Sequence, residues 1–149
     1  MTVRNGINRW LLAILLAMPS VVLAGETLSL LTAAIEKCTV GSLSETSACL
    51  DNLYNKKSKE LEIHYKQLLS SLEDPTLLKA SQSTWLQFRK QSCEYETSGL
   101  DKVGGLYYYM YSRCLLETTD QRLSRINQYL ACKDGPCPTR IQKKASVKN

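Results

Sequence analysis

The 149-residue sequence has little of what small enzymes use for chemistry. Its single histidine, His64, leaves few routes to a zinc site or a histidine-based triad, and we expect it on an exposed helix surface. No C-x-x-C pair, Gly-rich phosphate loop, G-x-S-x-G or H-E-x-x-H motif occurs. Carboxylate pairs such as Glu60/Glu62 and Glu94/Glu96 are two residues apart, which places them on different faces of a helix. We therefore predict that the protein is not an enzyme and has no catalytic residue, cofactor or metal site.

The sequence also lacks a hydrophobic run long enough to span a membrane, which takes about 20 residues. The apolar stretch 10–23 is shorter. Arg4 and Arg9 precede it, and no acidic residue occurs before Glu26. It ends in a small-x-small cleavage motif at Ala24. These features are typical of a secretory signal peptide, so we predict that residues 1–24 are removed.

A lipid anchor is not expected after this cleavage. Leu23-Ala24-Gly25 resembles the start of a bacterial lipoprotein box, but Glu26 stands where the lipid-accepting cysteine would be. We therefore expect a periplasmic or secreted protein with no stable membrane anchor.

Positive charge is concentrated at the two ends of the chain. The net charge of +5 includes the two arginines of the predicted signal peptide, and residues 133–149 carry five basic residues and one acid. This leaves a net charge of −1 for the predicted domain, residues 25–132. We therefore expect no nucleic-acid binding by the domain, and we interpret residues 133–149 as a basic, mostly flexible tail.

All six cysteines follow the predicted signal peptide. An even number in a small exported chain is typical of a disulfide framework. Spacing alone leaves several pairings open, and the simplest one joins neighbours along the chain. The bridges would then be Cys38–Cys49, Cys93–Cys114 and Cys132–Cys137.

Apolar residues recur at helical spacing in three long segments. The first runs from about Cys49 to Leu72, with Ser44 or Thr46 as its cap and one polar gap at Lys57. The second follows Asp74 as N-cap and Pro75 as first helical residue, with Leu78, Trp85, Phe88, Ser92 and Cys93 on one face.

The third predicted helix runs from about Tyr107 to Leu130, and a shorter one over 27–37 precedes the other three. The expected inward stripe of the helix from Tyr107 to Leu130 is Tyr108, Tyr111, Cys114, Leu115, Thr118, Arg122, Ile126, Tyr129 and Leu130. Short connections make neighbouring helices antiparallel. The predicted fold is all-α: an antiparallel, disulfide-braced three-helix bundle with a short extra N-terminal helix.

Three consecutive tyrosines, Tyr107, Tyr108 and Tyr109, are the candidate partner-binding residues. Three adjacent helical positions span about 200°, so the three rings cannot all face one core. We expect at least one ring to be exposed beside Gly104-Gly105, where a tyrosine suits protein or carbohydrate recognition. Ordinary amphipathic packing at a bundle end is an equally good interpretation.

A longer motif links the second and third predicted helices. Residues 78–93 read L-K-x-x-Q-x-x-W-x-x-F-R-x-x-x-C, Gly104-Gly105 follow, and residues 114–122 read C-L-x-x-x-T-x-x-R. This pattern resembles the LprI-like lysozyme-inhibitor family of exported bacterial proteins, over about residues 38–130. The family tends to have Asp where Ser58 and Lys90 stand and Asn where Glu62 stands.

Four residues of this motif, Trp85, Arg89, Thr119 and Arg122, are interpreted as structural. Trp85 shares a helical stripe with apolar residues and is expected in the core. Arg89 and Arg122 lie beside core positions, so we expect their guanidinium groups to bind carboxylates or free helix-end carbonyls.

The resemblance implies a binding protein whose partner is a lysozyme or a related wall hydrolase, inhibited by steric occlusion. The alternative is a non-catalytic envelope accessory, docking or toxin-immunity protein, with the basic tail touching anionic wall polymer or lipid. A salt-sensitive interaction that disappears on deletion of residues 138–149 would favour this alternative.

Overall fold

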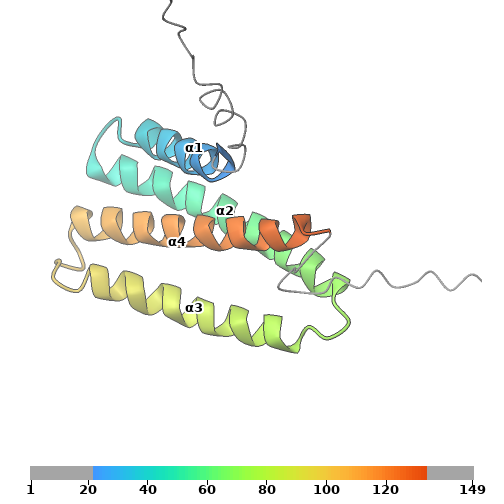
Figure 1. Ribbon diagram of the computed structural model, residues 1–149. Helices are drawn as coiled ribbons and strands as arrows, with labels where there is room; N and C mark the ends of the chain where they lie inside the picture. The colour runs from blue at the N-terminus through green and yellow to red at the C-terminus, as the bar shows by residue number, and fades with distance from the viewer. Residues whose placement is uncertain (1–21, 134–149) are drawn as a thin grey trace, which may run out of the picture.

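The structure is a computed structural model that describes the backbone of residues 22–133 and the side chains of residues 30–133. Within this range the chain forms four helices and no strand: α1 (Val22–Cys38), α2 (Leu43–Ser71), α3 (Thr76–Glu96) and α4 (Gly105–Ala131). Helices adjacent in sequence run antiparallel (Figure 1). The predicted all-α bundle with an extra N-terminal helix is therefore confirmed. α1 is longer than the predicted helix over 27–37, and it begins before the expected cleavage point at Ala24.

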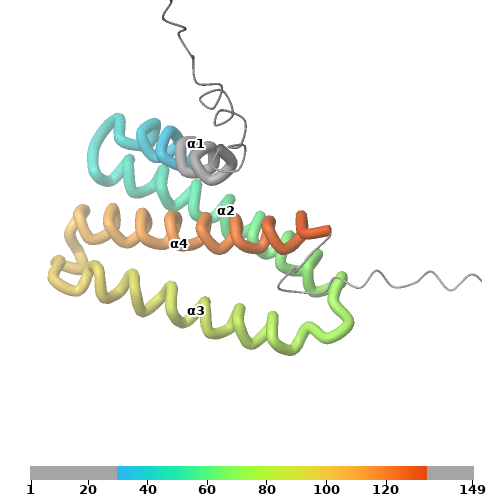
Figure 2. Tube along the Cα trace, in the orientation of Figure 1, coloured from blue at the N-terminus to red at the C-terminus, as the bar shows by residue number. Residues whose placement is uncertain are grey.

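The helix α4 is the central element of the bundle. It shares its most extensive interface with α2, and it also carries α3, whereas α1 packs on α2. The trace in Figure 2 shows that the α1–α2 and α3–α4 connections lie at the same end of the molecule. The start of α2 and the start of α4 are therefore neighbours in space.

The core consists of two apolar clusters along the α2–α4 interface. One contains Leu61, Leu68, Leu78, Leu123 and Ile126, and the other contains Cys38, Leu50 and Leu116. The α2 part of these clusters matches the predicted stripe. The polar gap in that stripe also has an explanation, because Lys57 Nζ lies 2.8 Å from Asp120 Oδ1 of α4.

The predicted inward stripe of α4 is only partly correct. The buried residues of α4 are Ser112, Cys114, Leu116, Thr119, Leu123 and Ile126. Tyr108, which was expected on the inward stripe, is 51% exposed. The cause is that α4 packs against α2 on one side and against α3 on another. The buried surface of α4 is therefore wider than a single helical stripe, and it is centred on a different side of the helix.

The inward assignment of Phe88 is wrong. This side chain is 57% exposed, although Leu78 and Cys93 on the same helix are buried as predicted. Because α3 packs mainly on α4, only a narrow face of α3 is buried, and Phe88 lies outside that face.

The helix α2 starts earlier than predicted, because Ser42 rather than Ser44 or Thr46 is its N-cap. The Ser42 hydroxyl accepts a hydrogen bond from the Glu45 N–H, and the Glu45 side chain accepts one from the Ser42 N–H, which forms a capping box. Gly41 precedes the cap with φ of 136°, a backbone conformation that favours glycine.

The start of α3 differs from the prediction by one position. Pro75 is the N-cap rather than the first helical residue. Asp74 still acts at this helix end, because its Oδ1 accepts a hydrogen bond of 2.9 Å from the Thr76 N–H.

Candidate functional site

Two disulfides brace the end of the bundle that holds the α1–α2 and α3–α4 connections. Cys38 is bonded to Cys49, and Cys93 to Cys114, as the simplest pairing predicted. Each bridge joins two successive helices close to the connection between them. Cys132 is disulfide-bonded as well, and its predicted partner Cys137 lies outside the described residues.

The same end carries a group of exposed apolar side chains, which we call the apolar end: Val40, Leu43, Val103, Leu106 and Tyr108. Val40 and Val103 are the most exposed of them, at 83% and 82%. The two connections adjoin here, because a Cβ on Gly105 would lie 3.5 Å from the Leu43 Cβ. Exposed apolar groups on one braced rim are typical of an interaction surface.

The three candidate tyrosines take different environments. The Tyr108 ring is half exposed, whereas Tyr107 is stacked on Tyr111 at 5.6 Å and meets Tyr108 edge-on at 5.5 Å. Tyr109 instead packs against the cluster that contains Leu116. The geometry therefore agrees with the expectation of at least one exposed ring, and only Tyr108 belongs to the apolar end.

Tyr111, which stacks with Tyr107 in this aromatic group, is partly buried. Burial raises the pKa of the Tyr111 phenol, and the nearby carboxylate of Glu94 raises it further. Tyr107 and Tyr111 are both partly buried, whereas Tyr108 is exposed.

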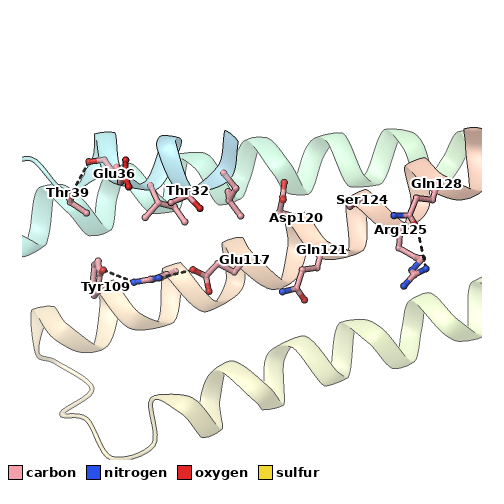
Figure 3. A pocket seen from close by; sticks show the side chains of 13 residues that line it. Thr32, Glu36, Thr39, Tyr109, Glu117, Asp120, Gln121, Ser124, Arg125 and Gln128 are labelled. Atoms are coloured by element: carbon pink, nitrogen blue, oxygen red, sulfur yellow. Dashed lines mark hydrogen bonds and ion pairs between the residues drawn. The ribbon is translucent and has the colours of Figure 1, made fainter. Parts of the chain in front are cut away.

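A groove of about 810 Å³ opens between α1 and α4 (Figure 3). Leu31 and Ile35 give it an apolar side on α1, and Tyr109 closes it near the apolar end. Charged groups on α4 line the other side, where Arg113 donates to Glu117 at 2.8 Å and to the Tyr109 hydroxyl at 3.3 Å. Sequence periodicity could not reveal this groove, since it depends on how α1 sits beside a helix distant in sequence.

Three carboxylates line the groove, and two of them have a basic partner. Glu117 is bonded to Arg113, and Asp120 is paired with Lys57. The third groove carboxylate, Glu36, lies on α1.

The four motif residues converge at the centre of the α3–α4 interface. The guanidinium carbons of Arg89 and Arg122 lie 4.8 and 5.7 Å from the centroid of Trp85. Arg89 Nη1 donates to the Thr119 hydroxyl at 2.9 Å. Trp85 is half-buried and packs against the larger core cluster, so its predicted core position is met in part.

The expected partners of the two arginines are wrong. Arg122 Nε donates to Gln82 Oε1 at 3.0 Å and Nη2 to Ser81 Oγ at 3.2 Å. Within the described part of the chain, neither Arg89 nor Arg122 forms an ion pair with a carboxylate. Instead of ion pairs, the two guanidinium groups form contacts with the Trp85 ring and hydrogen bonds to neutral oxygens, which their planar shape permits.

A family model described as "Lysozyme inhibitor LprI" matches residues 37–125. The chain belongs to the LprI lysozyme-inhibitor family. The LprI region covers α2, α3 and most of α4, with both described disulfides and the Trp85 cluster. No curated protein and no solved structure matches the chain.

At Ser58, Glu62 and Lys90 this chain departs from the residues expected for the LprI family. The charged side chains at these positions pair only within their own helix, and the Ser58 hydroxyl has no hydrogen-bond partner among the described residues. Lys90 lies 3.9 Å from Glu94, and Glu62 lies 2.6 Å from Lys66, each within one helix. The Ser58 hydroxyl and Arg89 Nε are buried without a hydrogen-bond partner. The charge network of this member therefore does not include an acid at position 58.

His64 and the other ionisable side chains form no recognisable catalytic or metal centre within the described residues. His64 is half-buried rather than exposed, and its Nδ1 bonds Asn127 Oδ1 across the α2–α4 interface. Over residues 22–133 no group of three or more His, Cys, Asp or Glu side chains could hold a metal ion. In the same part of the chain, no helix has the length and hydrophobicity needed to cross a membrane.

Proposed function

We propose that this LprI protein is an exported binding protein that inhibits a lysozyme or a related wall hydrolase by steric occlusion. The family match supports the class of function. The apolar end supports the mode of action, because it presents several apolar side chains on a rim held by two disulfides.

The apolar end has the properties of a surface that binds a preformed cleft. Central apolar and aromatic side chains provide most of the free energy in typical protein interfaces, and Tyr108 and Leu106 are exposed there. A braced rim loses little conformational freedom on binding, which favours affinity. A rigid protrusion of this kind would cover a substrate groove without any reaction.

Export after removal of residues 1–24 would bring the chain to the compartment in which its disulfides form.

The experiment compares variants of the oxidised, processed protein in binding and lysozyme-activity assays. Leu106→Asp and Tyr108→Ala should each weaken inhibition by about tenfold or more, as for central interface residues. Ile63→Asp is the matched control, because Ile63 is 64% exposed on α2 and lies outside the apolar end. Equal inhibition by all three variants would contradict this surface as the inhibitory one.

A further inference from the structure

Arg89 and Arg122 place two positive charges on one indole ring with only neutral hydrogen-bond partners. Their bonds go to Thr119, Gln82 and Ser81, while both guanidinium carbons lie within 5.7 Å of the Trp85 centroid. Two like charges at such a site repel each other unless an anion lies near. Among the described residues no carboxylate is paired with either of them.

The two guanidinium groups differ in access. Arg89 is enclosed, since its centre lies 4.8 Å from Trp85 and 5.4 Å from Tyr54, and its Nε is buried. Arg122 reaches the surface, where its bond to Ser81 is exposed. An incoming group can therefore reach Arg122 on its exposed side at Ser81, whereas the Arg89 bond to Thr119 is part-buried.

Arg122 retains donors for such a contact. A guanidinium has five N–H groups, and the described partners of Arg122 use one on Nε and one on Nη2. The Nη1 and Nη2 fork that binds a carboxylate through two parallel bonds is therefore still available. Burial lowers the pKa of Arg122, so a bound anion would relieve an existing cost.

Aromatic groups lie near this fork. The Trp85 ring centroid lies 5.7 Å from the guanidinium carbon, and Tyr129 and Tyr65 are near enough to raise the pKa of Arg122. All three rings pack against the larger core cluster as partly buried residues. A ligand that joins a carboxylate to a flat apolar body could use both features.

We propose that Arg122 and Trp85 form a binding site for a monovalent carboxylate carried on an apolar or aromatic body. The Nη1 and Nη2 donors of the fork match the two oxygens of a carboxylate, and the ring beside them favours an apolar body. The carboxylate could come from a free small molecule or from an acidic side chain of a protein, and the same geometry would hold both. The site is separate from the apolar end and does not depend on inhibition of a hydrolase.

The processed protein provides a direct reporter, because Trp85 is the only tryptophan after residue 24. Benzoate, acetate and phosphate are titrated at constant ionic strength while Trp85 fluorescence and the NMR signal of its indole N–H are followed. We expect saturable benzoate binding, and acetate binding weaker by about tenfold because it lacks the ring contact. Phosphate that binds as well as benzoate would overturn the proposal, as would the lack of any saturable change at Trp85.

Two variants separate the fork from general charge. Arg122→Gln should weaken benzoate binding by about tenfold or more, and Arg122→Lys should do nearly the same because it keeps the charge but loses the fork. Arg125→Gln is the control, since Arg125 bonds Gln128 on the same helix and should change binding by less than about twofold at physiological salt. Benzoate binding that survives in both Arg122 variants would overturn the proposal.

A final comparison identifies the source of the carboxylate and guards against misfolded variants. Acetyl-Glu-Phe-amide is titrated beside benzoate: tighter peptide binding supports an acidic side chain of a protein, and tighter benzoate binding supports a free small molecule. If Arg122→Gln does not fold by circular dichroism, NMR shifts in the unmodified protein decide the matter. They must centre on Trp85, Ser81, Gln82 and Arg122, and shifts centred elsewhere would overturn the site.

Discussion

Arg89 of α3 and Thr119 of α4 are joined by a hydrogen bond of 2.9 Å from Nη1 to the threonine hydroxyl. Thr119 is fully buried, and the guanidinium it accepts from is stacked on Trp85. This bond links two LprI motif residues that are 30 positions apart in sequence. It is one of the few polar contacts that fix α3 to the central helix.

Replacing Thr119 by valine tests this contact. Thr119→Val keeps the shape but removes the acceptor, so Arg89 would have unpaired donors at both Nη1 and the already unpartnered Nε. We expect a loss of about 1–3 kcal/mol in the free energy of unfolding, measured by urea denaturation. Thr118→Val is the control, because the Thr118 hydroxyl bonds the Cys114 carbonyl of its own helix, and its cost should stay within about 0.5 kcal/mol. Equal losses would contradict the assigned role of the pair.

Gly41 should be sensitive to any side chain. Its φ of 136° is unfavourable for other residues, and a Cβ there would lie 2.7 Å from Glu45 Oε2 in the capping box. Gly41→Ala should therefore lower the free energy of unfolding by roughly 1–2 kcal/mol. Gly99→Ala is the control and should be close to neutral, because a Cβ there would meet no atom within 4 Å. Thermal denaturation of both variants measures the difference.

The capping box also makes stability depend on acid pH. Hydrogen bonds from the Ser42 backbone and hydroxyl hold the pKa of Glu45 below its ordinary value of 4.5. A carboxyl group with a lowered pKa stabilises the fold above pH 4.5, and this contribution is lost as pH falls through the folded pKa.

The variant Glu45→Gln should therefore be less stable than the unmodified protein at pH 6, and the difference should shrink towards pH 3. Unfolding curves over this range measure it. Other groups with lowered pKa values, Glu62 and Asp74, titrate in both proteins and cancel in the comparison. A difference that is constant with pH would show that the Glu45 charge does not act through the cap.

The disulfides of the apolar end should contribute both to stability and to binding. Removing Cys93–Cys114, with both residues changed to alanine, opens a loop of 21 residues and should cost about 3 kcal/mol of unfolding free energy. Inhibition should fall even at temperatures where the variant remains folded, because the rim loses its brace. A folded variant with undiminished inhibition would show that the rim needs no disulfide.

The elements of this fold that depend on local pattern could be predicted from sequence. The positions of Leu50, Leu61 and Leu68 define the buried face of α2, and the nearest-neighbour pairing of Cys38–Cys49 and Cys93–Cys114 is correct. The Ser42-x-x-Glu45 signature of the α2 cap is present in the sequence, but it lies ahead of the apolar stripe that begins near Cys49.

Features that depend on packing between distant segments could not be predicted. Phe88 looks like a core residue because its spacing matches Leu78 and Trp85, and only the limited contact of α3 with its neighbours explains its exposure. The neutral partners of Arg122 and the α1–α4 groove likewise depend on which helices meet. The candidate tyrosines were correctly expected to differ in exposure, but nothing in the sequence indicated that Tyr108 would be the exposed one.

The central claim is that this LprI protein binds and inhibits a wall-cleaving lysozyme. The most direct measurement is titration of the oxidised, processed protein against lysozymes of several types, with calorimetry and enzyme activity recorded at low and physiological salt. The account predicts saturable, stoichiometric binding to at least one of them, with loss of its activity in step with occupancy and little loss of affinity at physiological salt, because the apolar end dominates the contact. No binding and no inhibition at either salt for any lysozyme would contradict it.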